Sequence, residues 1–230
     1  MKLPLLLTSL EDSAIGAIDA ALAAQAAGLL HIEDVGNLSV AEIDTLISCL
    51  ISLKRQQHFR TFWSNQDQAS SDMMRGRVGI ESLWSPAMTV LKQHQIKVRM
   101  ASPKEGYRAW YGGMSISRGV QGRTLDAAYD YLNWWLSGWP GAVMARQGYY
   151  ISTPELARPH LSASEWDFWY DGQPAAQDLP GPAGTCSMIR RGEVRDGGAY
   201  RTRMSRIAVW NTAMDEHNYL VRRWNDFISA

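Results

Sequence analysis

The chain has 230 residues, of which 46% are apolar and 20% are charged, and its 23 basic side chains balance its 23 acidic ones. This composition is typical of a globular protein of one or two domains and excludes a disordered chain. A formal charge of zero also excludes the strongly basic surface of a non-specific nucleic-acid-binding protein, so no nucleic-acid partner is expected.

The N-terminal half alternates between strand and helix signals. The pattern predicts strands at 2–8, 61–63, 78–83 and 96–100, and helices at 13–29, 40–55, 66–74 and from 85 onward. The helix at 40–55 is the clearest, because Ser39 and Glu42 have capping-box spacing and its apolar residues recur at the helical period. The apolar run Leu3–Leu7 is shorter than the ~7–15 residues of a secretory signal core. We interpret it as a buried strand and expect no export signal in this chain.

The second half of the chain, after Gly122, is almost entirely helix and loop. The pattern predicts helices at 125–137, from Pro140 to Gly148, at 164–170 and at 199–228, with a loop over 172–185. The change of character predicts an α/β lobe followed by the helical part of another lobe.

Catalytic and cofactor-binding motifs are missing from the sequence. None of the common nucleotide-binding, metalloprotease or nucleophile-elbow patterns occurs, and the cysteines Cys49 and Cys186 form no CxxC pair. Asp215, Glu216 and His217 are consecutive, so on a helix they point in different directions and suit a metal poorly. We therefore expect no enzyme activity, no metal and no cofactor. A small-molecule enzyme whose site is assembled only in three dimensions stays open as an alternative.

Residues 98–154 carry an ordered set of motifs. Pro103–Gly106 reads Pro-Lys-Glu-Gly, Trp110–Met114 follows, and then come the aromatic helix at 125–137 and the pair Gly148-Tyr149. This order resembles the C-terminal two-thirds of the spermidine/putrescine-type periplasmic solute-binding proteins of ABC transporters. The resemblance extends over nearly the whole chain.

The resemblance implies an α/β fold of the periplasmic-binding-protein type II. Residues 1–108 would form the second lobe, 109–118 the hinge crossing, and 119–230 the mainly helical C-terminal part of the first lobe. The two lobes would close over a small polar or cationic solute, and the partner would be the permease of an ABC transporter. The family further implies a periplasmic location.

The resemblance also assigns the ligand-binding residues. Trp110 and Tyr149 match the pocket tryptophan and tyrosine of the family, whose faces can stack on an alkylammonium group for about 0.5–2 kcal/mol each. The loop that faces the cleft in relatives corresponds here to Ser82, Trp84 and Ser85. Two neighbours complete the predicted site: Tyr111, beside Trp110, and Glu81, which could supply a carboxylate. We expect seven further tryptophans to be packing residues, namely Trp134, Trp135, Trp139, Trp166, Trp169, Trp210 and Trp224.

The sequence departs from the polyamine-binding pattern at charged positions. Polyamine binders have an Asp two residues after the pocket tryptophan, where this chain has Gly112. Acidic residues near the start of the first helix of the second lobe correspond to Leu10 and Ser13, although Glu11 and Asp12 lie beside them. A dication without carboxylate partners is costly to desolvate. A monocation, a zwitterion or another small polar solute is therefore equally open.

The chain begins where the second lobe of the family begins. On that alignment we expect a truncated form, with exposed apolar surface and self-association through the incomplete first lobe. The alternative function is a structural or interaction module that derives from such a lobe and binds no solute.

Overall fold

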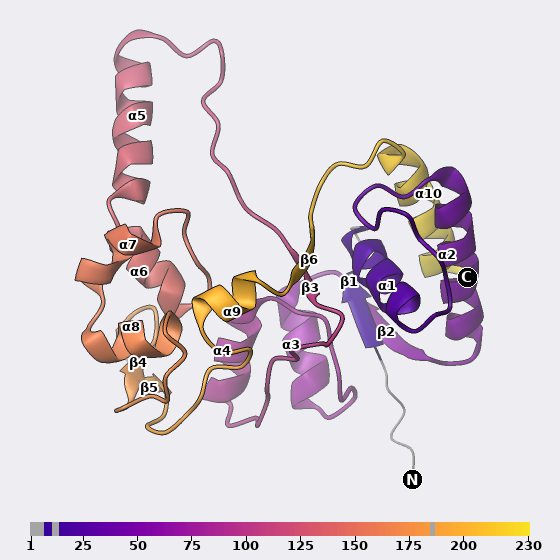
Figure 1. Ribbon diagram of the computed structural model, residues 1–230, viewed down its shortest axis with the longest axis horizontal. Helices are drawn as coiled ribbons and strands as arrows, with labels where there is room; N and C mark the ends of the chain where they lie inside the picture. Colours follow the sequence, from indigo (N-terminus) through magenta and orange to yellow (C-terminus); the bar gives the residue numbers. More distant parts are fainter. Residues whose placement is uncertain (1–6, 11–13, 185–186) are drawn as a thin grey trace. The chain divides into compact units, whose positions relative to one another are not determined.

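The computed structural model describes residues 7–10, 14–184 and 187–230 (Figure 1). Contacts between residues divide the described chain into two compact units. Unit 1 contains the described residues up to Ile96, together with Ser102–Trp110 and Arg206–Ala230. Unit 2 contains Lys97–Ala101 and the described residues of Tyr111–Ser205.

Unit 1 combines parallel strand pairs with helices, as expected for an α/β protein. Its elements are β1 (Leu7–Leu10), α1 (Ile15–Ala26), α2 (Val40–Arg55), β2 (Phe59–Trp63), α3 (Gln66–Met74), α4 (Ser85–Gln93), β3 (Tyr107–Ala109), β6 (Ile207–Trp210) and α10 (His217–Ser229). β1 pairs in parallel with β2, and β3 pairs in parallel with β6. Because parallel neighbours need crossover connections, the helices between the strands are part of the same architecture.

The core of unit 1 lies where α2 meets α1 and α10. The predicted capping box is confirmed, since Ser39 Oγ accepts from the Glu42 backbone N–H and the Glu42 carboxylate accepts from the Ser39 backbone N–H at 2.8 Å. Lys54, in the last turn of α2, donates to the carbonyls of Phe227 and Ile228 at 3.1 and 2.6 Å. This lysine satisfies carbonyls that the end of α10 would otherwise leave unpaired. The buried side chains of this core include Ile18, Ile43, Leu46, Ile47, Leu220, Trp224 and Phe227.

Unit 2 is mainly helical. Its elements are α5 (Gly122–Leu136), α6 (Trp139–Arg146), α7 (Pro154–Ala157), η1 (Arg158–His160), α8 (Ala163–Trp169), β4 (Leu179–Pro180), β5 (Ser187–Ile189) and α9 (Tyr200–Met204). β4 and β5 form an antiparallel pair. The core gathers aromatic rings of α8 around this pair, and its buried residues include Ala145, Trp166, Phe168, Trp169, Tyr170, Leu179 and Ile189. The packing role expected for Trp166 and Trp169 is thus confirmed.

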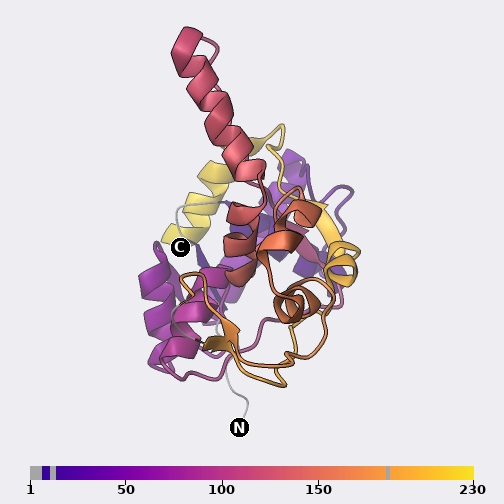
Figure 2. The same ribbon diagram turned by 90° about the vertical axis from the view of Figure 1, so that its left-hand side faces the viewer.

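Helix α5 exposes an aromatic face. It stands clear of the other helices of unit 2 and joins them at its C-terminal end (Figures 1 and 2). Tyr131 stacks on Trp134, whose ring also lies 5.9 Å from that of Trp139, and all three side chains remain about half exposed. The expectation that Trp134 and Trp139 are packing residues is therefore wrong in part. The exposed apolar surface expected between residues 119 and 230 is present on this helix.

Two predicted strands are absent and one predicted helix is divided. Residues 78–83 and 96–100 contain no strand, and the long final helix expected at 199–228 is interrupted. α9 ends at Met204, and β6 then pairs with β3 before α10 begins at His217. The β-branched residues of β6 favour an extended backbone when a neighbouring strand is available, which outweighs the helical pattern. Residues 2–6 of the first predicted strand and residue 13, the predicted start of the first helix, lie outside the described residues.

The C-terminal segment belongs to unit 1. The sequence analysis groups 206–230 with 119–205, whereas the contacts group Arg206–Ala230 with β3, α1 and α2. The assignment of lobes to 1–108 and 119–230, with a crossing at 109–118, stays a prediction.

Candidate functional site

The loop before α4 presents Trp84 at the surface of unit 1. Ser82 and Trp84 are exposed, whereas Glu81 and Ser85 are half-buried. Trp84 is the residue immediately before α4, and its ring makes an edge contact with Trp63 at 5.3 Å and 79°. Trp63 is buried at the end of β2, so it fixes one edge of Trp84 and leaves 40% of that side chain exposed. The sequence analysis placed Trp63 in a strand but gave it no role beside Trp84.

Trp110 lies directly after β3, at the last residue of unit 1 before the chain continues into unit 2. Its position is set by the pairing of β3 with β6, in which the Asn211 N–H donates to the Ala109 carbonyl at 2.8 Å. Arg108 adds a two-point ion pair with Asp19 of α1, at 3.1 and 3.2 Å. The side chain of Trp110 is 47% exposed on this fixed backbone, as a ligand-stacking ring requires.

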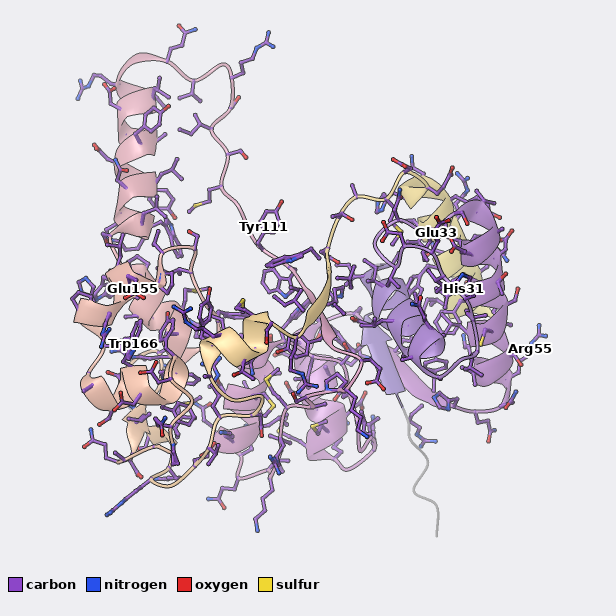
Figure 3. All side chains as sticks on the ribbon, in the orientation of Figure 1. His31, Glu33, Arg55, Tyr111, Glu155 and Trp166 are labelled. Atoms are coloured by element: carbon purple, nitrogen blue, oxygen red, sulfur yellow. The ribbon has the colours of Figure 1, made fainter. Side chains whose placement is uncertain are left out.

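Two of the points at which the chain passes from one unit to the other lie at neighbouring strands. It leaves unit 1 after Trp110, at the end of β3, and returns at Arg206, just before β6. Tyr111, the residue of unit 2 that follows Trp110, is 77% exposed and projects from the chain beyond β3 (Figure 3). Residues 110–117 belong to no helix and no strand.

Tyr149 follows α6 in unit 2 and is half-buried. Burial raises the pKa of its hydroxyl above the usual value, so Tyr149 is neutral at physiological pH. Hydrogen bonds hold the residues on either side of Tyr149. The Tyr150 hydroxyl donates to the Trp169 carbonyl at 3.3 Å, and the Gly148 carbonyl accepts from Arg195 at 3.0 Å.

Arg195 has no role in the sequence analysis. Its side chain is nearly buried, and its guanidinium lies 4.8 Å from the ring centres of both Tyr150 and Trp169. It also donates to the Trp169 carbonyl at 2.6 Å. This arginine therefore fixes the segment that carries Tyr149. No local sequence motif predicts this role of Arg195, because its hydrogen-bond partners Trp169 and Gly148 lie 26 and 47 residues away in the chain.

In the cluster Asp215–His217, the first residue, Asp215, connects two segments of unit 1. Asp215 accepts from the Asn37 amide at 3.0 Å, and its own N–H donates back to Asn37 at 3.0 Å. This reciprocal pair ties the loop before α2 to the segment that leads into α10. Within the described residues, no group of three or more His, Cys, Asp or Glu side chains has a metal-binding arrangement.

The predicted ligand-binding residues are distributed over both units. Unit 1 carries Glu81, Ser82, Trp84, Ser85 and Trp110, and unit 2 carries Tyr111 and Tyr149. The three aromatic residues Trp84, Trp110 and Tyr111 are exposed, and each can offer a ring face to a solute. That these residues together form one site stays a prediction.

A comparison with protein-family models identifies a family for this chain. The model described as bacterial extracellular solute-binding protein matches residues 6–185, which include parts of both units. A comparison with curated protein sequences found no match. Among the helices of the described residues, none combines the length and the apolar character that crossing a membrane requires.

Proposed function

Because the chain belongs to the family of bacterial extracellular solute-binding proteins, we propose that it captures a small solute and delivers it to the permease of an ABC importer. The observation that carries the proposal is the family match over residues 6–185. Capture is reversible binding without chemical conversion, in the periplasm of the cell. Transport of the solute across the membrane is left to the permease.

Units 1 and 2 act in this proposal as the two lobes of a type II binding protein. The connections at the end of β3 and at the start of β6 would serve as the hinge. A hinge needs residues whose backbone dihedral angles can change without breaking a strand pair. The segment 110–117 meets this requirement, because it follows the β3–β6 pair and belongs to no helix or strand itself. Solute would shift the population toward the closed form by binding that form more tightly.

The ligand in this proposal is a small polar or cationic solute, a class that includes putrescine and spermidine. Exposed rings at Trp84, Trp110 and Tyr111 favour a ligand with an alkylammonium or other polarised apolar group. Gly112 supplies no carboxylate, so a single positive charge or a zwitterion needs fewer partners than a polyamine does.

A second function, an interaction module that binds no solute, is favoured by a different observation. The aromatic face of α5, with Tyr131 and Trp134 half exposed, is more apolar than a solvated helix usually is. In this alternative the same fold would dock a macromolecule and the exposed rings near β3 would have no ligand.

Replacing Trp110 by alanine tests the proposed function. We expect Trp110→Ala to weaken solute binding about tenfold or more, because a stacking ring in a desolvated site contributes on the order of 1–2 kcal/mol. Isothermal titration calorimetry with the solute that stabilises the wild-type chain measures the change. Trp139→Ala is the matched control, since it removes a half-exposed tryptophan outside the predicted site. Equal affinity of the wild type and Trp110→Ala would remove Trp110 from the site.

A further inference from the structure

A pocket of about 490 Å³ lies within unit 1, on the face where β2 and α3 meet. Its volume falls in the range of about 300–1,000 Å³ that is usual for small-molecule sites. The lining comes from β2, from α3 and from the turn that follows α3, and consists of Arg60, Thr61, Gln68, Ser71, Asp72, Arg75 and Arg77. None of these residues belongs to the predicted solute site.

The pocket carries an excess of positive charge. Asp72 is its single carboxylate; its side chain is 6% exposed and accepts from Arg77 Nη1 at 3.1 Å. This ion pair is neutral as a unit and forms part of the wall. Arg60 and Arg75 remain, and within the described chain neither guanidinium has a hydrogen bond or an ion pair with another residue. Two guanidinium groups thus line one pocket without a protein carboxylate to balance them.

Helix electrostatics accounts for only part of this arrangement. Arg75 follows the last residue of α3, where a cation offsets the negative end of the helix dipole. That explanation does not extend to Arg60, which lies on β2 and lines the same pocket. The convergence of Arg60 and Arg75 from separate elements is therefore the feature that needs a ligand.

We propose that this pocket binds a small oxyanion, a carboxylate or phosphate compound with two negative charges. Guanidinium groups present planar pairs of N–H donors that match the oxygens of carboxylate and phosphate. Ser71 also lines the pocket, and its hydroxyl can donate a further hydrogen bond. The amide of Gln68 is already engaged, with the Ser64 N–H at 3.2 Å and the Phe62 carbonyl at 3.3 Å, so it shapes the wall instead.

Calorimetric titration with inorganic phosphate and, in a separate arm, with succinate tests the oxyanion pocket. We expect the wild-type chain to bind at least one of them at low ionic strength and to lose affinity as salt is added. Arg60→Ala and Arg75→Ala should each weaken binding about tenfold, because each removes charge-assisted hydrogen bonds. The anion that binds more tightly shows whether the pocket prefers a phosphate or a carboxylate compound.

Arg55→Ala is the matched control, because Arg55 is an exposed arginine at the end of α2 that projects into solvent outside the pocket (Figure 3). It should leave the affinity unchanged within about twofold. If an alanine variant fails to fold by circular dichroism, Arg60→Lys and Arg75→Lys replace it. The lysine variants keep the positive charge but lose the planar pair of N–H donors, so the affinity should still fall several-fold.

Two outcomes would overturn the oxyanion pocket. One is the absence of heat with both anions at about 10 mM, a concentration that would reveal even millimolar affinity. The other is an equal loss of affinity in Arg55→Ala and in the pocket variants. It would show that the anion responds to the overall charge of the protein and does not bind in this pocket. Neither outcome bears on the proposed solute capture, because Trp110→Ala and Arg60→Ala alter different sites and are read with different ligands.

Discussion

Replacing Arg146 by alanine is expected to lower the free energy of unfolding of unit 2 by about 3–5 kcal/mol. Arg146 Nε donates to Glu165 Oε1 at 2.6 Å, and the two side chains are only 19% and 5% exposed. Alanine would leave the Glu165 carboxylate buried beside Trp166 and Trp169 without its charged partner. Removing one member of a buried pair is costly for that reason, even where the intact pair adds little. Urea denaturation, followed by tryptophan fluorescence, measures the loss.

Glu165 also predicts a pH dependence. Burial alone would raise the pKa of this carboxyl, but the hydrogen bonds from Arg146 and Ser162 outweigh burial and hold its pKa below the usual value of 4.5. A carboxyl with a lowered folded-state pKa stabilises the fold above its unfolded-state pKa, and this contribution disappears as the pH falls through the folded-state pKa. The stability of the wild type should therefore fall as the pH drops below about 4.5. The difference between wild type and Arg146→Ala should narrow over the same interval.

Arg191→Ala is the control for this experiment, because it removes an exposed arginine of the same unit. It should change the free energy of unfolding by less than about 0.5 kcal/mol. A loss below about 1 kcal/mol in Arg146→Ala would show that Glu165 finds another partner or water, and would contradict the buried-pair account.

Replacing Gly106 by alanine is the second change with a large expected effect. Gly106 has a φ of +85°, and a methyl group there would lie 2.6 Å from the Arg206 carbonyl oxygen and 2.9 Å from Ala208 Cβ. Backbone strain and steric overlap should together cost about 3 kcal/mol. The overlap falls on the neighbouring strand, next to the hydrogen bond from the Tyr107 N–H to the Arg206 carbonyl at 3.2 Å. The mutation therefore loosens β3 from β6, where the chain passes between the units.

Thermal and urea unfolding of Gly106→Ala measure this loss. Gly113→Ala is the matched control, because a methyl group at Gly113 meets nothing within 4 Å and its φ lies outside the left-handed region. Equal stability of the two variants would show that β3 can shift away from β6 at no cost, and that their pairing does not anchor the crossing.

The sequence predicts the elements whose signals are local. Ser39 and Glu42 lie three residues apart, and the apolar face of α2 repeats within four turns, so both could be read from neighbouring residues. β6 could not, because its extended form depends on β3, which lies almost a hundred residues earlier. Without that partner the stretch 199–228 resembles a single helix. The strands predicted at 78–83 and 96–100 show the opposite error. Their apolar pattern suits a strand, but neither segment pairs with another strand in the described chain.

Site residues follow the same division. Trp84 and Trp110 are exposed, and their ligand-binding role stays a prediction from a resemblance that rests on local motifs. Trp63 and Arg195 act through contacts with residues distant in sequence, so nothing near them indicates their support of Trp84 and Tyr149. The same reasoning explains why the pocket between Arg60 and Arg75 escapes a reading of the sequence. These arginines are fifteen positions apart in the sequence, and the contact between α3 and β2 brings them to one pocket.

Thermal unfolding of the purified chain with a panel of solutes tests the central claim most directly. The panel contains putrescine, spermidine, quaternary amines, amino acids and sugars. A ligand at about 100 times its Kd should stabilise the protein by about 2.7 kcal/mol, which raises the Tm by several degrees for a chain of this size. The account predicts such a shift with one class of solute, retained in Trp139→Ala and reduced in Trp110→Ala. A cooperative transition that no member of the panel shifts would contradict solute capture and favour the interaction module.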